Sequence, residues 1–488
     1  MKPTALSRSG FAGLPHPICL VVLLACWLAG AVQAASLPTP VAQALKTAGI
    51  PQSAVAVVVQ AVDARRPRLA LHAAVAMNPA STMKLLTTFA ALDMLGPAYT
   101  WQTEAYTSGT LTDGVLTGDV HLRGSGDPAL TYERFGRLLR ELRSRGLRDI
   151  YGDLVLDRSA FAVEATDPGQ FDNAPTRPYN VTPDALLLNF NALSLQLIPA
   201  GTTGPPTVLI EPPLANLDLV NQIRPDAGGP CDGDWQDALR ADSFAHGASL
   251  RLVLSGSYPS SCGERRWHTA PTDHSLFVLG VFRQLWAELG GSFSGAVRDG
   301  PVPPDARLLA VLPSPTLGEV VRDINKYSNN VMARQLFLTL GLAAGHRPAT
   351  TEDSVTAVQA WLAKRGLTLP GLVLENGSGL SRSERISAAD LSRLLLAAWR
   401  SAVMPELMSS LPIAANDGTM KKRLLQNGVA GQAHIKTGSL DGVSAIAGYV
   451  LDKRGRRWVV VCLVNHPNAA AAHPAMDALL QWVWAAKN

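Results

Sequence analysis

The apolar positions of residues 85–95 recur three and four apart, which is the period of an α-helix. Pro79 disfavours helix just before this stretch, and Gly96 ends it. The pattern therefore predicts a buried helix that begins near Ser81, with Lys84 on the same face one turn along. The apolar face consists of Leu85, Leu86, Phe89, Leu92 and Leu95.

The two ends of the chain share this mixture of helical and strand patterns. The N-terminal part predicts a short amphipathic helix over 40–48 and buried β-branched strands over 53–61 and 69–73. The last third predicts several helices and then an antiparallel meander of three strands. The predicted helices span 316–323, 331–342, 354–365, 388–400 and 475–486, and the strands span 431–438, 445–451 and 457–464.

The middle of the chain has a different pattern. Residues 101–123 alternate and carry turn signals, which predicts antiparallel strands, and residues 130–147 and 275–289 predict helices. Residues 163–267 are rich in Pro, Gly, Asp and Asn. We therefore expect an α/β (α+β) domain interrupted by a large insertion. The predicted segments are a leader at 1–34, the first domain at 35–100 and 305–488, an inserted domain at 101–163 and 268–304, and a nested β-rich domain at 164–267.

The N-terminus has the pattern of an export signal. Lys2 and Arg8 precede an apolar stretch at 18–31, and Val32-Gln33-Ala34 supplies the small residues of a cleavage site. The mature chain would begin near Ala35, in the periplasm or outside the cell. An uncleaved membrane anchor is the alternative.

Charge and cysteine content narrow the classes of function. The 488 residues carry a net charge of only +4, which does not favour a nucleic-acid partner. Of the three cysteines left after cleavage, Cys231 and Cys262 could pair in an oxidising compartment, and Cys462 lies in an apolar run typical of a buried thiol. The chain has no clustered His/Cys pattern of a metal site, and no cofactor is expected.

Three short motifs carry chemistry. Ser81 and Lys84 are spaced so that a neutral lysine amine can take the proton of a serine hydroxyl. Ser328-Asn329-Asn330 places a hydroxyl and a carboxamide before a predicted helix, and Lys436-Thr437-Gly438-Ser439 ends a predicted strand. Each motif is common alone, but the ordered set is far less so.

This set resembles the signature of penicillin-binding proteins and β-lactamases. The whole mature chain is similar to the D-alanyl-D-alanine carboxypeptidase/endopeptidase family, the class C low-molecular-mass penicillin-binding proteins, in which more than two hundred residues separate the first two motifs. At three positions, Asn376, Met420 and Ser439, this chain has a residue other than the one usual in the family. Four further stretches of this chain resemble landmarks of the family. They are Gly124-Ser125-Gly126-Asp127-Pro128, Gly152-Asp153 with Asp157 and Phe161, Gly377-Ser378-Gly379-Leu380-Ser381-Arg382, and Asp417-Gly418-Thr419.

The resemblance implies a transpeptidase-like domain, an antiparallel sheet flanked by helices, with two smaller inserted domains. It also implies that Ser81 forms an acyl-enzyme with D-Ala-D-Ala stem peptides of peptidoglycan, and that β-lactams trap it covalently. The backbone N–H groups of Ser81 and Ser439 would form the oxyanion hole. The implied roles of the other residues are a base for Lys84, proton transfer for Ser328 between Lys84 and Lys436, a hold on the substrate amide for Asn330, and binding of the terminal carboxylate for Lys436, Thr437, Gly438 and Ser439.

Several alternatives stay open from the sequence. Asp157 would touch the diamino-acid side chain of the substrate or have a structural role. A β-lactamase on the same scaffold and a non-catalytic peptidoglycan-binding protein are the rival functions. The sequence does not decide the balance of carboxypeptidase and endopeptidase activity. It also leaves open whether the protein contacts a membrane peripherally and whether it forms a homo-oligomer.

Overall fold

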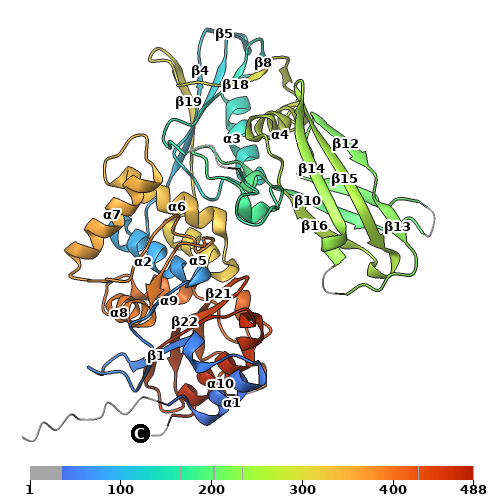
Figure 1. Cartoon of the computed structure of the whole chain (residues 1–488). Coiled ribbons are helices and arrows are strands. Elements are labelled where there is room, and N and C mark those ends of the chain that lie inside the picture. Colours follow the sequence, from blue (N-terminus) through green and yellow to red (C-terminus); the bar gives the residue numbers. More distant parts are fainter. Residues whose placement is uncertain (1–35, 164–166, 202–203, 233–234, 427, 487–488) are drawn as a thin grey trace, which may run out of the picture. The chain divides into compact units, whose positions relative to one another are not determined.

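The computed structural model describes residues 36–488 apart from 164–166, 202–203, 233–234, 427 and 487–488 (Figure 1). The predicted leader at 1–34 lies outside the described residues. Residues 36–488 belong to one compact unit. Among the helices that the structure describes, none is both long enough and apolar enough to cross a bilayer.

The first and last parts of the chain share a five-stranded antiparallel sheet in the order β2-β1-β23-β22-β21. Figure 1 labels β1 from the first part and β21 and β22 from the last part in the same region of the molecule. The predicted C-terminal meander is confirmed, and the N-terminal strand joins it because β1 pairs with β23. The two ends of the chain therefore build one sheet. Its strands are β1 (Val55–Ala61), β2 (Leu69–Leu71), β21 (Ala433–Leu440), β22 (Val443–Leu451) and β23 (Arg457–Asn465).

Helices cover both faces of this sheet. Side chains of a strand alternate between its faces. On β22, Ser444 Oγ contacts Met476 of α10 (His473–Trp484), whereas the Tyr449 hydroxyl donates to the Leu395 carbonyl of α8 (Ala388–Trp399). Since positions 444 and 449 point to opposite faces, α10 covers one face and α8 the other. Helix α1 (Thr39–Thr47) packs on α10.

The motif residues belong to the helical layer on the α8 side. Its centre is α2 (Lys84–Leu95), preceded by the single 3-10 turn η2 (Ala80–Met83). The residues from Lys84 to Leu92 are all buried, because α5, α6, α7 and α8 surround this helix. The predicted helices are confirmed, and α9 was not predicted. The remaining helices of the layer are α5 (Leu317–Tyr327), α6 (Asn330–Ala343), α7 (Thr351–Lys364) and α9 (Met404–Ser410), and a two-stranded pair is formed by β3 (Ala76–Met77) and β20 (Ile386–Ser387).

The inserted region contains two further sheets, in the orders β18-β9-β7-β4-β19 and β17-β8-β6-β5. Because β19 pairs with β4, residues up to Pro313 take part in the first of these sheets. The strands are β4 (Gln102–Thr107), β5 (Thr110–Thr112), β6 (Val115–Thr117), β7 (Val120–Gly124), β8 (Asp149–Ile150), β9 (Leu154–Asp157), β17 (Ser292–Phe293), β18 (Val297–Asp299) and β19 (Arg307–Pro313), and the helices are α3 (Tyr132–Ser144) and α4 (His274–Glu288).

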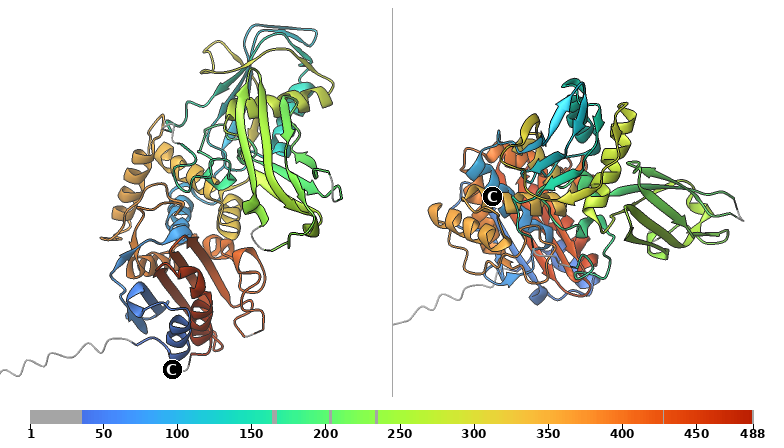
Figure 2. Two further views of the ribbon diagram at one scale, coloured as in Figure 1. Left: turned by 45° about the vertical axis from the view of Figure 1, so that its right-hand side comes forward. Right: turned by 90° about the horizontal axis from the view of Figure 1, so that it is seen from above.

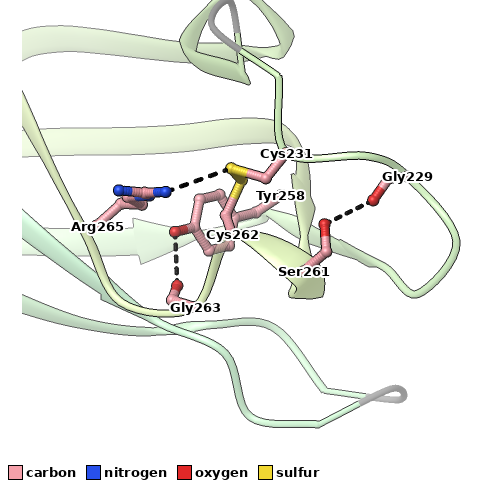
Figure 3. The surroundings of a disulfide bond; sticks show 7 residues. All are labelled: Gly229, Cys231, Tyr258, Ser261, Cys262, Gly263 and Arg265. Carbon is pink, nitrogen blue, oxygen red and sulfur yellow. Dashed lines mark hydrogen bonds between the residues drawn. A yellow bond between two sulfur atoms is a disulfide. The ribbon is translucent and has the colours of Figure 1, made fainter.

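The nested region is built from β-strands, as predicted, and they run side by side in green in Figure 2. Cys231 and Cys262 form a disulfide there (Figure 3), and Cys462 is a buried free thiol. One continuous apolar core joins these strands to the inserted sheets, so the domain division itself stays a prediction. The strands are β10 (Leu193–Ile198), β11 (Thr207–Glu211), β12 (Leu217–Asn221), β13 (Arg224–Asp226), β14 (Leu239–His246), β15 (Ser249–Pro259) and β16 (Arg265–Thr269).

Candidate active site

Ser81 lies in the turn η2, directly before α2, where two other segments come close to its backbone. A Cβ on Gly379 would lie 1.9 Å from the Ala80 carbonyl oxygen, and a Cβ on Gly438 would lie 3.0 Å from the Ser81 nitrogen. No side chain fits at either position. The loop that contains Gly379 and the strand β21 can therefore approach Ser81 only because both positions are glycine.

Lys84 occupies the first turn of α2 and points back toward Ser81. Its Nζ lies 2.9 Å from Ser81 Oγ, as the one-turn spacing predicts. Two further acceptors surround the same amine: Asn330 Oδ1 and the Ser378 carbonyl oxygen, each at 2.5 Å. The Lys84 side chain is fully buried, so these groups replace the water that an exposed lysine would bind.

Ser328 and Lys436 form the second part of the site. Ser328 follows the last turn of α5 in the left-handed conformation, with φ of 58°, which turns the chain into α6. Lys436 Nζ donates to Ser328 Oγ and to the Thr437 carbonyl oxygen, both at 2.8 Å. The predicted contact of Ser328 with Lys436 is therefore present. Its predicted contact with Lys84 is not among the hydrogen bonds of the described residues, and Asn330 contacts Lys84 instead.

The two lysines have strongly perturbed protonation. Burial lowers the pKa of Lys84 well below its usual value, and the positive charge of Lys436 lowers it further, while the Glu384 carboxylate acts in the opposite direction. Burial also lowers the pKa of Lys436, to about 7. This is the direction that the sequence predicts for Lys84. An uncharged Lys84 is able to accept a proton from Ser81.

The turn that presents the Ser378 carbonyl is held by the buried carboxylate of Glu384. Its Oε1 accepts backbone N–H groups from Glu375, Asn376 and Gly377 at 2.9 to 3.2 Å. Burial raises the pKa of Glu384. This carboxylate thus fixes the segment that positions Lys84, a function that sequence reasoning did not assign to it.

A cavity of about 530 Å³ opens beside Ser81 Oγ. Ser81, Ser328, Asn330, Thr437 and Ser439 all line it, so the structure brings all three motifs to one cleft. Gly438 does not line the cavity, but it packs against the Ser81 backbone. The other lining residues are Phe171, Asp172, Tyr179, Leu380, Arg382, Thr419, Leu440 and Asp441.

Sequence reasoning missed the part of this cavity that the inserted region contributes. Asp172 accepts hydrogen bonds from the Tyr179 hydroxyl at 2.7 Å and from Asn180 at 2.8 Å. The Arg382 guanidinium lies 4.6 Å from the centre of the Phe171 ring, and both side chains line the cavity with Ser81. Arg382 belongs to a landmark stretch and was recognisable. Phe171 and Asp172 lie in a Pro- and Asp-rich segment that carries no motif.

Asp157 does not belong to this cavity. It ends β9, is 4% exposed, and lines two other cavities. Its carboxylate accepts from the backbone N–H and hydroxyl of Ser159 and from the backbone N–H of Val302. These bonds hold a turn outside the Ser81 cavity, which favours the structural alternative over the predicted contact with substrate.

Two further observations complete the site. The Thr437 hydroxyl donates to Thr419 Oγ1 at 2.7 Å, and Asp417 accepts from Lys326 at 2.7 Å, which ties the landmark 417–419 to the wall of the cavity. Among the residues that the structure describes, no group of three or more His, Cys, Asp or Glu side chains is placed to hold a metal ion.

Comparisons with known proteins agree with this geometry. A family model for the D-Ala-D-Ala carboxypeptidase 3 (S13) family matches residues 37–486. The D-alanyl-D-alanine carboxypeptidase DacB of Haemophilus influenzae is 27% identical over 391 residues, 80% of each chain. The D-alanyl-D-alanine carboxypeptidase of Actinomadura sp. (strain R39) is 28% identical over 424 residues, 82% of this chain and 75% of that one.

The fold is also found in a solved structure. The crystal structure of penicillin binding protein 4 from Haemophilus influenzae superimposes with a TM-score of 0.75 at 24% sequence identity. The match covers 90% of this chain and 99% of that chain. The predicted fold class, a sheet flanked by helices with a large insertion, is thereby confirmed.

Proposed function

This chain belongs to the D-Ala-D-Ala carboxypeptidase 3 (S13) family, and from that premise we propose that it is a serine-type D-Ala-D-Ala carboxypeptidase or D,D-endopeptidase that acts on peptidoglycan stem peptides. The observation that carries the proposal is the separation of 2.9 Å between Ser81 Oγ and the Nζ of a fully buried lysine. A buried amine with a depressed pKa beside a hydroxyl is the arrangement that serine acylation needs.

Acylation begins with the proton of Ser81. A neutral amine has two N–H donors and one lone pair. Asn330 Oδ1 and the Ser378 carbonyl accept the two N–H groups of Lys84, which leaves the lone pair for the Ser81 hydroxyl. As Lys84 takes this proton, Ser81 Oγ bonds to the carbonyl carbon of the penultimate D-alanine. The backbone N–H groups of Ser81 and Ser439 stabilise the oxyanion.

The peptide C–N bond then breaks and the leaving amine needs a proton. Ser328 lines the cavity, and because its oxygen accepts from Lys436, its own O–H remains available to the amine. Ser328 recovers its proton from the Lys436 ammonium group, while Lys84 keeps the proton that it took from Ser81, so the two lysines together still carry one proton. Water subsequently hydrolyses the acyl-enzyme and regenerates the Ser81 hydroxyl.

Substrate recognition involves groups on both sides of Ser81. We assign the terminal carboxylate to Lys436, Thr437 and Ser439 along the edge of β21, with Gly438 allowing close approach. The Asn330 amide N–H groups are left to hold the substrate carbonyl, since its oxygen contacts Lys84. A β-lactam amide resembles the scissile bond and would acylate Ser81 in the same way.

The inserted region supplies the side-chain subsite of this proposal. Asp172 replaces Asp157 as the acidic group, and it lies on the cavity wall with Arg382 and Tyr179. A carboxylate beside a guanidinium suits a diamino-acid side chain that ends in an amine and a carboxylate. The Cys231–Cys262 disulfide supports an oxidising location, and we place the protein in the periplasm or outside the cell.

The test is covalent labelling of the mature protein with a reporter penicillin, together with D-alanine release from a pentapeptide. We expect both in the wild type and neither in Ser81→Ala or Lys84→Met. A thermal unfolding scan of each variant checks that it is folded. Labelling of folded Ser81→Ala at the wild-type rate would contradict the assignment of the nucleophile. Digestion of cross-linked muropeptides then separates carboxypeptidase from endopeptidase activity.

A further inference from the structure

Two turns at one end of the five-stranded sheet bear a cluster of basic side chains. None of these side chains lines the Ser81 cavity. Residues 62–68 join β1 to β2, and residues 452–456 join β22 to β23. Because Ala61 pairs with Trp458, and the Val62 N–H donates to the Arg457 carbonyl, the two turns lie side by side. The exposed basic residues on them are Arg65, Arg66, Arg68, Lys453, Arg454 and Arg456.

A cavity of about 350 Å³ lies between these turns, and we call it the arginine pocket. Segments almost four hundred positions apart in the sequence build it, so no local motif indicates it. Its lining consists of Ala61, Ala64, Arg66, Arg68, Asp452, Arg454, Arg456, Trp458 and Ala486.

The acidic groups near the arginine pocket are already engaged. Asp452 accepts the backbone N–H groups of Arg454 and Arg456 and the Trp458 Nε1–H, each at 2.9 Å. Asp63 accepts from the Arg456 guanidinium at 2.8 Å. Among the described residues, the guanidinium groups of Arg66, Arg68 and Arg454 have no hydrogen-bond or ion-pair partner. Three guanidinium groups without a hydrogen bond or ion pair among the described residues thus line one pocket, and the Asp452 carboxylate interacts electrostatically with one of them, Arg454.

Aromatic rings hold part of this charge in place. The Arg68 guanidinium lies 4.7 Å from the Trp482 ring centre and 5.7 Å from that of Trp458, and Arg456 lies 5.1 Å from the Trp458 ring. A cation–π contact fixes a guanidinium without using its N–H donors. The donors of Arg68 are therefore both positioned and available.

We propose that the arginine pocket binds a phosphate group, as a free phosphate-bearing molecule or as the headgroup of an anionic phospholipid. Three guanidinium groups around one space offer more donors than the two oxygens of a carboxylate accept, whereas a phosphate has enough oxygens to bond to all of them. Tryptophan beside clustered arginine is also a combination found at membrane surfaces. This inference is independent of the chemistry at Ser81.

The test compares two double variants of the same charge. Arg66→Gln/Arg454→Gln removes two of these guanidinium groups from the pocket. Arg137→Gln/Arg140→Gln on α3 is the matched control, since both side chains are exposed and have no hydrogen-bond partner among the described residues. Inorganic phosphate is titrated by calorimetry, and binding to phosphatidylcholine vesicles with and without phosphatidylglycerol is measured by co-sedimentation.

We expect the wild type and the control to bind phosphate alike, and the pocket variant to bind at least about tenfold more weakly. If the three proteins rank in the same order in binding to vesicles with phosphatidylglycerol, the phosphate group that the pocket binds is that of a lipid headgroup. If vesicles do not bind, it is a soluble phosphate compound. Absence of phosphate binding in the wild type, or equal loss in both variants, overturns the proposal. Labelling of Ser81 by penicillin should be unchanged in all three proteins, which keeps this result separate from the proposed function.

Discussion

Replacement of Gly379 by alanine measures how closely the backbone around the nucleophile is held. Gly379 is buried, has φ of 82°, and approaches the Ala80 carbonyl so closely that a Cβ would lie 1.9 Å from its oxygen and 2.7 Å from the Ser81 nitrogen. Both neighbours are backbone atoms, so no side-chain rotation relieves the overlap. Either the loop or the turn that carries Ser81 has to move.

The cost has two parts that can be separated. Alanine in the left-handed region costs about 1–2 kcal/mol of unfolding free energy. Forcing a methyl group into a packed site adds about 1–3 kcal/mol. Gly345 is the matched control, because it has φ of 98° and nothing lies within 4 Å of the added Cβ. Gly345→Ala should therefore show only the first part, and Gly379→Ala should show both.

The functional effect should be confined to Gly379→Ala. A displacement of about 1 Å at a reacting group costs about 100-fold in rate, so acylation by a reporter penicillin should slow by that order. Gly345→Ala should acylate at the wild-type rate. Denaturant unfolding and stopped-flow acylation measure the two quantities. Equal loss of unfolding free energy and equal acylation rates in the two variants would contradict the close contact of Gly379 with the backbone of Ala80 and Ser81.

Three further predictions concern charge, recognition and the disulfide. The kcat/KM for a D-Ala-D-Ala peptide should rise with pH as Lys84 loses its proton. It should fall as the pH passes about 7, because Lys436 then loses the charge that binds the carboxylate. A pH profile that keeps rising above 8 would contradict this prediction. Asp172→Asn should raise KM about tenfold for peptides with a free side-chain amine, while Asp157→Asn leaves KM unchanged in a steady-state assay. Replacing Cys231 and Cys262 by serine should lower the unfolding free energy by about 4 kcal/mol, given their separation of 31 residues, without changing penicillin labelling.

Local spacing was enough to predict the chemical centre. Ser81 and Lys84 are one helical turn apart, so their contact depends only on the helix that the apolar period indicates. The strand that carries Lys436 was also predictable, because the C-terminal meander has short turns and continuous apolar strands. These features require no knowledge of distant packing.

The rest of the site depends on contacts between distant segments. Asp172 reaches the cavity because a loop of the inserted region packs there, and neither its composition nor its spacing indicates that position. Asp157 is the last residue of a buried strand, which made it a reasonable candidate, but the turn after β9 uses its carboxylate. The contact of Lys84 with Asn330 rather than Ser328 depends on how α5 and α6 are joined, through the left-handed backbone of Ser328.

The two buried lysines provide a reason why substrate binding favours the reactive state. Burial disfavours a charge on either side chain, and two neighbouring positive charges repel, so the pair tends to carry one proton. Burial lowers the pKa of both lysines, and the charge of Lys436 lowers the pKa of Lys84 further, which favours the proton on Lys436. A substrate carboxylate bound at Lys436 stabilises that ammonium group. In the mechanism that we propose, this charge in turn keeps Lys84 neutral, so recognition of the terminal carboxylate prepares the base that activates Ser81.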